Sequence, residues 1–260
     1  MDDVVATFRT APSTAGIFAD FDGTLSEIVH IPSDARPIEG AVDLLLELGH
    51  RFALVAIVSG RSAVQLAEWL GPSLEIWGTH GAEYARGGSI SVTERAARYE
   101  ELMTRVRDEA QKELERLGLE GVVLEDKRVM IGLHFRNATD VEAARLALDR
   151  LADALADGHG LIRAGGRLAF ELRPPEEFSK AAVVLERARE LDLKAALFIG
   201  DDRVDLPAFD ALDVLAEEGV KTLRVAVTSD EAPPELLERA DLVVDGPSGA
   251  VSFLRGLLDD

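Results

Sequence analysis

Short apolar runs alternate along the chain with stretches in which apolar residues recur at helical spacing. Each run is bounded by Gly, Asp or Ser, which is typical of strands that a parallel sheet buries on both faces. Strands are predicted at residues 15–20, 52–59, 195–200, 223–228 and 241–246. Helices are predicted between them, near residues 38–48, 61–70, 178–191, 205–214, 233–239 and 248–258. Because parallel strands need crossover connections, the alternation predicts an α/β fold with a doubly wound parallel sheet.

The middle of the chain breaks this alternation. Residues 93–117 predict one long helix closed by Gly118, and paired strands follow in VVLEDKR and MIGLHFR. The pattern then repeats, with a helix at 140–158 and strands at 160–166 and 167–174. Gly87-Gly88 and Pro174-Pro175 flank the segment and are candidate hinges. We therefore expect a core domain formed by residues 1–88 and 175–260, and an inserted α+β domain of order αββαββ at 89–174.

The composition narrows the classes of protein that fit. The chain has 260 residues, 47% of them hydrophobic, which is enough for two domain cores. It has no cysteine, which excludes a disulfide framework and favours a reducing compartment. The first residues lack the features of a signal peptide and no apolar run is long enough to span a membrane, so we expect a cytoplasmic protein without a membrane partner. The net charge of -20 disfavours nucleic acid as a partner, and we expect a monomer.

The first predicted strand ends on two acids, Asp20 and Asp22, in the sequence ADFDGT. Open α/β sheets bind ligands at the carboxyl ends of their strands, so the pair fits phosphoryl transfer. Asp20 can attack phosphorus to form an aspartyl-phosphate, while Asp22, on the same side of an extended chain, protonates the leaving oxygen. Two acids can also simply cap a strand. A calcium loop fits less well, because Leu25 and Glu27 break its spacing.

Two carboxylates need cations nearby before they can accept a phosphate dianion. FIGDD ends a strand on Asp201 and Asp202, with Asp205 a helical turn later, and these hard oxygen ligands suit Mg²⁺. Ser59 in IVSGR stands at a predicted helix start, where a hydroxyl and free N–H groups can hold phosphate oxygens. Lys180 in FSKAAVV can neutralise the nucleophile. Alternatively, Ser59 can simply cap a helix and Lys180 can be a solvated surface lysine.

Taken in chain order, DFDGT, Ser59, Lys180 and GDDRVD resemble the motifs of the haloacid dehalogenase superfamily of phosphohydrolases. The resemblance implies a Rossmann-like core that uses Mg²⁺ and an inserted α+β cap that covers the active site. It implies that Asp20 is the nucleophile and that Asp22 is the general acid and then the base, with Ser59 and Lys180 on the phosphate. The implied metal ligands are Asp20, the main-chain carbonyl of Asp22, Asp201 and, through the metal's waters, Asp205.

A finer resemblance, to the trehalose-6-phosphate phosphatase family, rests on the predicted cap and its borders. It is carried by the segments HGAE, EDKR, LHFR and ELRP, together with PSDARP and VAIVSGR. Carboxylates accept hydrogen bonds from sugar hydroxyls, whereas Lys and Arg donate to them. The resemblance implies a sugar-phosphate substrate, trehalose 6-phosphate. The implied substrate-binding residues are Arg61, His80, Glu83, Glu125, Lys127, Arg136 and Glu171.

Three positions depart from that family's usual sequence. Val204 and Leu206 replace a Thr and a Glu of its last motif, and Ala181 replaces the Gly after the motif lysine. A hydroxyl and an acid near the metal are lost, whereas Asp205 is kept. The alternatives are another capped sugar phosphatase (for sucrose 6-phosphate, a glycosyl-phosphoglycerate or several hexose phosphates), a phosphomutase, and a catalytically silent module that senses a sugar phosphate.

Overall fold

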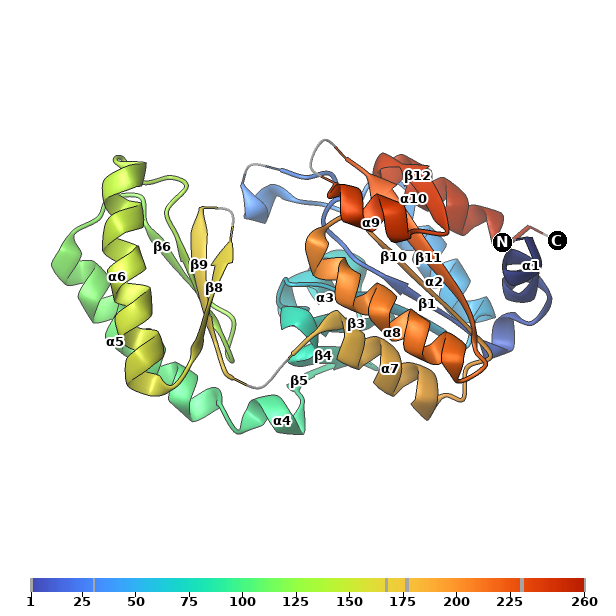
Figure 1. Ribbon diagram of the computed structural model, residues 1–260, viewed down its shortest axis with the longest axis horizontal. Coiled ribbons are helices and arrows are strands. Elements are labelled where there is room, and N and C mark those ends of the chain that lie inside the picture. Colours follow the sequence, from blue (N-terminus) through green and yellow to red (C-terminus); the bar gives the residue numbers. More distant parts are fainter. Residues whose placement is uncertain (1, 30, 167, 176–177, 230–231, 260) are drawn as a thin grey trace. The chain divides into compact units, whose positions relative to one another are not determined.

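The computed structural model of the chain describes residues 2–29, 31–166, 168–175, 178–229 and 232–259. The chain divides into two compact units, one of Met1–Ser91 with Phe178–Asp260 and the other of Val92–Glu177 (Figure 1). The second unit is one continuous segment, so the first unit is assembled from the two ends of the chain. The sequence predicts a division of this kind at 88/89 and 174/175, and the role of the inserted unit in specificity stays a prediction.

The first unit is built on an eight-stranded sheet of order β12-β11-β10-β1-β2-β3-β4-β5. Its strands are β1 (Ala15–Ala19), β2 (Leu54–Val58), β3 (Glu75–Gly78), β4 (Glu83–Arg86), β5 (Ser89–Val92), β10 (Ala195–Gly200), β11 (Lys221–Thr228) and β12 (Leu242–Asp245). All pairs from β12 to β3 are parallel, and β4 is antiparallel to β3. Strand order proceeds in opposite directions from β1 and from β10, which puts the topological switch point between these two central strands. The predicted doubly wound α/β fold is confirmed.

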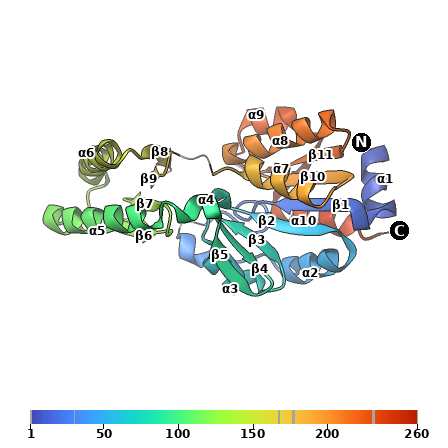
Figure 2. The same cartoon turned by 90° about the horizontal axis from the view of Figure 1, so that it is seen from below.

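Helices cover both faces of this sheet, α7, α8 and α9 one face and α2 and α3 the other (Figure 2). The helices of the unit are α1 (Asp2–Thr10), α2 (Ala41–Arg51), α3 (Ala63–Leu70), α7 (Lys180–Glu190), α8 (Leu206–Glu217), α9 (Pro234–Arg239) and α10 (Gly246–Gly256), and its 3₁₀ turns are η1 (Pro12–Thr14), η2 (Pro32–Asp34), η3 (Thr79–Gly81) and η4 (Arg203–Asp205). Successive strand residues point to opposite faces. Ile17 therefore lies in the apolar cluster of α2 and α10, whereas Phe18 lies in that of α7 and α8.

The sequence did not predict α1, β3, β4 or β5. β3 and β4 lack a continuous apolar run, because each carries charged residues. Glu75 in β3 accepts hydrogen bonds from Arg187 and Arg86, and these bonds let an acid occupy a half-buried strand. Gly87 and Gly88, a predicted hinge, both have positive φ and connect β4 to β5 of the same sheet, so they form a turn within the first unit.

The second unit has a four-stranded antiparallel sheet and helices packed on it, in the order ααββαββ, which is the predicted αββαββ with its first helix divided in two. The strands, in sheet order, are β6 (Val123–Asp126), β7 (Ile131–His134), β9 (Ala169–Arg173) and β8 (Ile162–Gly166), and the helices are α4 (Glu94–Ala97), α5 (Glu100–Leu117) and α6 (Val141–His159). Position 167, where a strand was predicted to begin, lies outside the described residues. The single helix predicted at 93–117 is wrong. Thr93 caps α4, and the bond from Tyr99 N to Ala96 O tightens and ends its last turn before α5 begins.

The end of β3 lies against the first turn of α3. A Cβ added to Gly78 would lie 2.2 Å from the backbone nitrogen of Ala63, and a backbone cannot move aside as a flexible side chain can. We expect Gly78→Ala to lower the free energy of unfolding by about 1–3 kcal/mol, measured by chemical denaturation. The matched control is Gly49→Ala on the exposed side of α2, where a Cβ meets nothing within 4 Å and should stabilise the protein by about 0.5–1 kcal/mol. Equal effects of the two substitutions would contradict the prediction.

Candidate active site

Three of the predicted site residues directly follow neighbouring strands. Asp20 follows β1, Ser59 follows β2 and Asp201 follows β10. Because β1 pairs in parallel with both β2 and β10, the three side chains meet at one edge of the sheet, beside its switch point. All three are buried, with at most 5% of any of them exposed. The structure therefore brings the predicted nucleophile, phosphate-binding hydroxyl and metal ligand together.

Lys180, the first residue of α7, lies between two of the acids. Its Nζ is 2.7 Å from Oδ1 of Asp20 and 2.6 Å from Oδ1 of Asp205. Ser179 caps the helix by accepting a hydrogen bond from Ala182 N, so α7 begins directly at this lysine. The Lys180 side chain is 1% exposed, which excludes the alternative of a solvated surface lysine.

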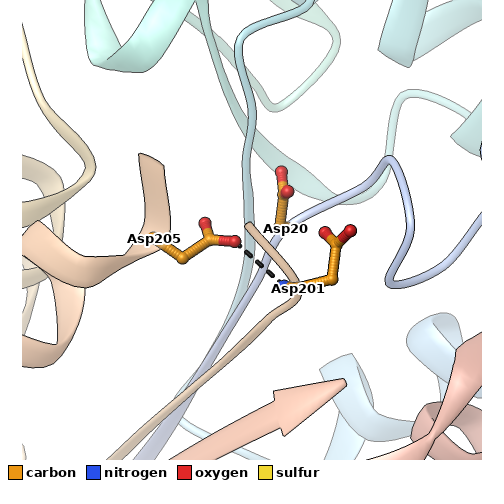
Figure 3. A group of neighbouring side chains, drawn as sticks. All are labelled: Asp20, Asp201 and Asp205. Carbon is orange, nitrogen blue, oxygen red and sulfur yellow. Dashed lines mark hydrogen bonds between the residues drawn. The ribbon is translucent and has the colours of Figure 1, made fainter. Parts of the chain in front are cut away.

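Asp205 connects this lysine to the loop after β10. Its Oδ2 accepts hydrogen bonds from the backbone N–H groups of Asp201 and Asp202, both at 3.0 Å. Figure 3 shows the Asp205 carboxylate directed at the backbone nitrogen of Asp201. Asp205 is fully buried, so these bonds replace the hydration that its charge loses. The carboxylate thereby fixes the backbone that carries Asp201.

The loop after β1 passes closely against Asp201. Gly23 has a φ of 71°, and a Cβ there would lie 2.0 Å from Oδ2 of Asp201, so both the backbone conformation and the contact require glycine. The hydroxyl of Thr24 donates to Oδ1 of the same carboxylate at 3.4 Å. The DFDGT and GDD loops are therefore packed against each other.

Burial raises the pKa of two of these carboxyl groups. Loss of hydration is the largest cause for both. It raises the pKa of Asp20 to about 7 in spite of the opposing charge of Lys180, and it raises that of Asp201 to about 9 with added repulsion from Asp20 and Asp205. For Lys180, burial alone would lower the pKa, but the charges of Asp20 and Asp205 outweigh it and hold that pKa above its ordinary value. The ammonium group therefore stays charged.

The site has three carboxylates but only one ammonium group, and this imbalance of charge favours a divalent cation. One oxygen from each of Asp20, Asp201 and Asp205 lies within 4.8 Å of the others. Lys180 neutralises one of the three carboxylates, and a cation of charge +2 would neutralise the remaining two. Carboxylate oxygens are the ligands that Mg²⁺ prefers. Because Asp205 already accepts bonds from Lys180 and the backbone, Asp20 and Asp201 are the better direct ligands, and Asp205 fits a supporting role.

Val204 and Leu206, the departures in the last motif, flank Asp205. Val204 is 46% exposed, whereas Leu206 is 9% exposed and belongs to the apolar cluster of α7 and α8. The backbone and Lys180 contacts of Asp205 are made without the polar side chains that these two positions lack. The geometry of the acidic group is thus compatible with both replacements.

Ser59 lies before α3 and does not begin it. Ser62 caps α3, which begins at Ala63, two residues after the start of the helix predicted near residues 61–70. The hydroxyl of Ser59 accepts a hydrogen bond from Arg61 N at 3.3 Å. A contact of Ser59 with phosphate therefore depends on its hydroxyl rather than on the first turn of α3.

Glu83 and His80, both predicted substrate contacts, hold the Ser59 loop. Glu83 is 2% exposed, and its Oε2 accepts a hydrogen bond from Ala63 N at 2.9 Å, where the positive end of the helix dipole attracts a carboxylate. His80 N donates to Ser59 O at 2.9 Å from a turn in which Thr79 and His80 have φ values of 51° and 56°. Contact of either residue with substrate stays a prediction.

Asp22 forms a two-pronged ion pair with Arg61. Nε and Nη2 of Arg61 donate to Oδ2 and Oδ1 of Asp22, both at 2.7 Å. The Asp22 side chain is 40% exposed, so the predicted acid is accessible while the predicted nucleophile is buried. Sequence reasoning missed this pairing, and also Gln65 and Trp69, which contact the same guanidinium. Arg61 precedes α3, so helical spacing from this residue does not reveal them.

In the second unit, the structure brings Glu125, Lys127 and Glu171 together. Lys127 Nζ is 2.9 Å from Glu171 Oε1 and 3.7 Å from Glu125 Oε2, and Glu125 Oε2 is also 2.8 Å from His134 Nε2. Burial alone would lower the pKa of Lys127, but the two glutamates outweigh it and raise that pKa. Arg136, another predicted contact, follows β7 and is half-buried.

These charged residues share one face of the four-stranded sheet. The strand register places Glu125 and Glu171 on either side of Gly132, in one row across β6, β7 and β9. The adjacent row contains Leu133 and Phe170, which belong to the apolar cluster of α5 and α6. Because side chains alternate between faces, the glutamates lie on the face turned away from these helices. The predicted substrate contacts thus fall into two groups, one in each unit.

Within the described parts of the chain, no helix combines the length and the apolar character needed to cross a membrane.

The family model for trehalose-phosphatase matches residues 18–238 of the chain. The chain is 34% identical over 253 residues to a trehalose-phosphate phosphatase of Mycolicibacterium paratuberculosis, covering 94% of this chain and 62% of that protein. It is 36% identical over 215 residues to the trehalose-phosphate phosphatase of Mycobacterium marinum, covering 78% of this chain and 52% of that protein. The chain therefore spans about half to three-fifths of the length of these relatives.

Solved structures resemble the fold. A trehalose-6-phosphate phosphatase related protein aligns with a TM-score of 0.77 and 23% identity over 94% of this chain and 96% of that one. The C-terminal domain of the C. albicans trehalose-6-phosphate phosphatase aligns with a TM-score of 0.72 and 20% identity over 98% of this chain and 96% of that one. At these identities the likeness concerns the fold alone.

The raised pKa values predict that protons and a divalent cation compete for the acidic site. A carboxyl group with a raised pKa binds its proton more tightly in the folded state, so stability that the metal-free protein has at low pH is lost as the pH rises through about 7 and then about 9. A bound cation should offset this loss. We therefore expect Mg²⁺ to raise the melting temperature more at about pH 9 than at about pH 6. Asp201→Asn should remove most of the effect, and an equal Mg²⁺ effect at both pH values would contradict the prediction.

Proposed function

The chain belongs to the trehalose-phosphatase family, and on that premise we propose that it hydrolyses trehalose 6-phosphate to trehalose and inorganic phosphate with the help of Mg²⁺. The observation that carries the proposal is the buried Asp20 carboxylate, held by Lys180 beside Asp201 at the switch point of the sheet. The relatives named trehalose-phosphate phosphatase support the choice of substrate. A monomeric state and a cytoplasmic location remain predictions from the sequence.

In the proposed first step, Asp20 attacks phosphorus. Lys180 holds Oδ1 of Asp20, and Oδ2 forms the new bond to phosphorus while the bond from phosphorus to the sugar oxygen breaks. Asp22 gives a proton to that leaving oxygen, so trehalose departs as a neutral alcohol. The hydroxyl of Ser59 donates to a phosphoryl oxygen. The product is a phosphorylated Asp20.

In the second step, water releases the phosphate. Asp22, now a carboxylate, takes a proton from the water molecule as its oxygen bonds to phosphorus, and the bond from phosphorus to Asp20 breaks. Asp20 is thereby regenerated as a carboxylate beside Lys180. One acid therefore serves as donor and then as acceptor of the proton, as its 40% exposure permits.

Charge neutralisation contributes much of the rate, because a phosphate dianion approaches a site rich in carboxylates. Uncatalysed monoester hydrolysis is slow enough that enzymes accelerate it by up to ~10²¹-fold. Asp20, Asp201 and the main-chain carbonyl of Asp22 would hold the cation, with Asp205 supporting it. When bound, Mg²⁺ supplies positive charge to the nucleophile and to the phosphoryl oxygens.

The charged residues Glu125, Lys127 and Glu171 of the second unit support a sugar substrate. Lys127 presents an ammonium group between two carboxylates, so donors and acceptors lie within a few ångströms of one another. Such a set suits the hydroxyls of a neutral disaccharide, each of which both donates and accepts. We propose that Glu125, Lys127 and Glu171 bind trehalose. Contacts of His80 and Arg136 with substrate remain predictions from the sequence.

Release of inorganic phosphate tests the function directly. The wild-type chain should release phosphate from trehalose 6-phosphate only with Mg²⁺ present, and faster than from sucrose 6-phosphate or glucose 6-phosphate. Asp20→Asn should lower the rate by roughly 10⁴-fold or more, because it removes the nucleophile, while melting remains cooperative. Substantial activity in this variant would refute the role of Asp20. A preference for another sugar phosphate would refute trehalose as the leaving group.

Lys127→Ala tests the sugar site separately from the chemistry. We expect it to lower kcat/KM for trehalose 6-phosphate by roughly 10–100-fold, because two carboxylates lose their shared partner and the sugar loses a donor. Turnover of p-nitrophenyl phosphate, which has no sugar, should change little. Lys112→Ala, on the exposed side of α5, is the matched control and should leave both substrates unaffected. Equal losses on both substrates would argue against a sugar contact.

A further inference from the structure

The guanidinium of Arg61 is committed to partners within the first unit. Nε and Nη2 donate to the two oxygens of Asp22 at 2.7 Å each, and Nη1 donates to Oε1 of Gln65 at 3.2 Å. A two-pronged bond between a guanidinium and a carboxylate fixes the direction of both groups as well as their distance. This two-pronged bond, called the fork below, therefore holds Asp22 in one orientation. It leaves few N–H groups of Arg61 for a substrate.

Aromatic rings hold Arg61 from the other side. Its guanidinium carbon lies 5.0 Å from the ring centre of Trp69 and 5.8 Å from that of Phe21, and the two rings are stacked at 5.4 Å. These are cation–π distances, and stacking restricts the plane of the guanidinium. The Arg61 side chain is only 11% exposed. The Arg61 side chain is thus held by contacts other than Asp22. A residue needs such contacts if it is to fix the orientation of another.

The backbone of Arg61 is anchored as well. Its carbonyl accepts a hydrogen bond from Thr79 N at 2.7 Å, and its N–H donates to the hydroxyl of Ser59 at 3.3 Å. Arg61 therefore connects the phosphate-binding hydroxyl to the proton-transferring acid. The Asp22 side chain is 40% exposed, and both of its oxygens accept hydrogen bonds from Arg61.

From these contacts we infer that Arg61 is a positioning residue that acts through Asp22, aiming the carboxylate that takes the proton from water, rather than a contact to the sugar phosphate. The inference rests on the proposed function. Misplacing a reacting group by about 1 Å can cost roughly 10²-fold in rate, and general acid–base catalysis contributes roughly 10²–10⁴-fold. We therefore expect Arg61→Ala to lower kcat for trehalose 6-phosphate by roughly 10²-fold, with little change in KM.

The test uses p-nitrophenyl phosphate in rapid-mixing experiments. Its leaving group needs no proton, so phosphorylation of Asp20 should proceed in Arg61→Ala while the release of phosphate, which needs Asp22 as a base, becomes slow. We expect a burst of about one p-nitrophenolate per enzyme and then slow turnover, as in Asp22→Asn, the reference for a lost acid and base. The double variant should be no slower than Asp22→Asn alone.

Conservative and matched variants separate positioning from folding. Arg61→Lys keeps the charge but not the fork, so it should show the same burst with a melting temperature close to that of the wild type. Added guanidinium ion should restore turnover in Arg61→Ala. Arg36→Ala is the matched control, because Arg36 lies over the same Trp69 ring at 5.1 Å but donates to the carbonyls of Ser33 and Ala35. It should show no burst.

The outcomes distinguish the inference from the proposed function. An active wild type whose Arg61 variants raise KM at unchanged kcat, without a burst, would overturn the inference and assign Arg61 to substrate binding. Additive losses in the double variant would overturn it too. A wild type that hydrolyses no phosphate ester would instead refute the proposed function, and the inference with it.

Discussion

A buried ammonium between two buried carboxylates is the interaction on which the site depends. Asp20 directly follows β1, Lys180 begins α7, and Asp205 lies in the turn after β10. Each of the three charges would be costly to bury alone. Removing one partner of such a group typically costs about 3–5 kcal/mol, because the remaining charge stays desolvated. Lys180 therefore offsets much of the cost of burying these carboxylates together. The same desolvation raises the pKa values of Asp20 and Asp201 and makes a divalent cation favourable there.

Most of the sheet could be predicted because its central strands are buried on both faces. Such strands are continuous apolar runs, and β1, β2 and β10, which are buried along their length, lie at predicted positions. β11 and the edge strand β12 are only partly buried, but they carry similar apolar runs and also lie at predicted positions. β3 and β4 could not be found in this way, since Glu75 and Arg86 interrupt the apolar pattern and are accommodated by partners distant in sequence. The break between α4 and α5 depends on one tightened turn at Tyr99, which helical periodicity does not reveal.

Prediction of the candidate site from the sequence is limited in the same way, by contacts between distant residues. Strand ends could be recognised from local sequence, and the parallel register then requires Asp20, Ser59 and Asp201 to lie together. The burial of Glu83 at the start of α3 and the fork from Arg61 to Asp22 are contacts between residues twenty or more positions apart. A pattern within one segment carries no information about such pairs. For this reason, the residues of the candidate site could be predicted from the sequence, whereas the group that each side chain contacts could not.

The discontinuity of the first unit also has a consequence for the order of folding. The second unit is continuous, so every strand pair in it, including the pairing of β7 with β9 across α6, lies within one segment of the chain. Phe18 in β1, by contrast, pairs with Phe198 in β10, which the ribosome supplies long afterwards. During synthesis, β1 therefore lacks its neighbour β10 at one edge for as long as β10 has not been made, while the inserted unit can already form. Asp20 acquires its buried partner only once Lys180 has emerged, so the acidic site is assembled only after most of the chain has been synthesised.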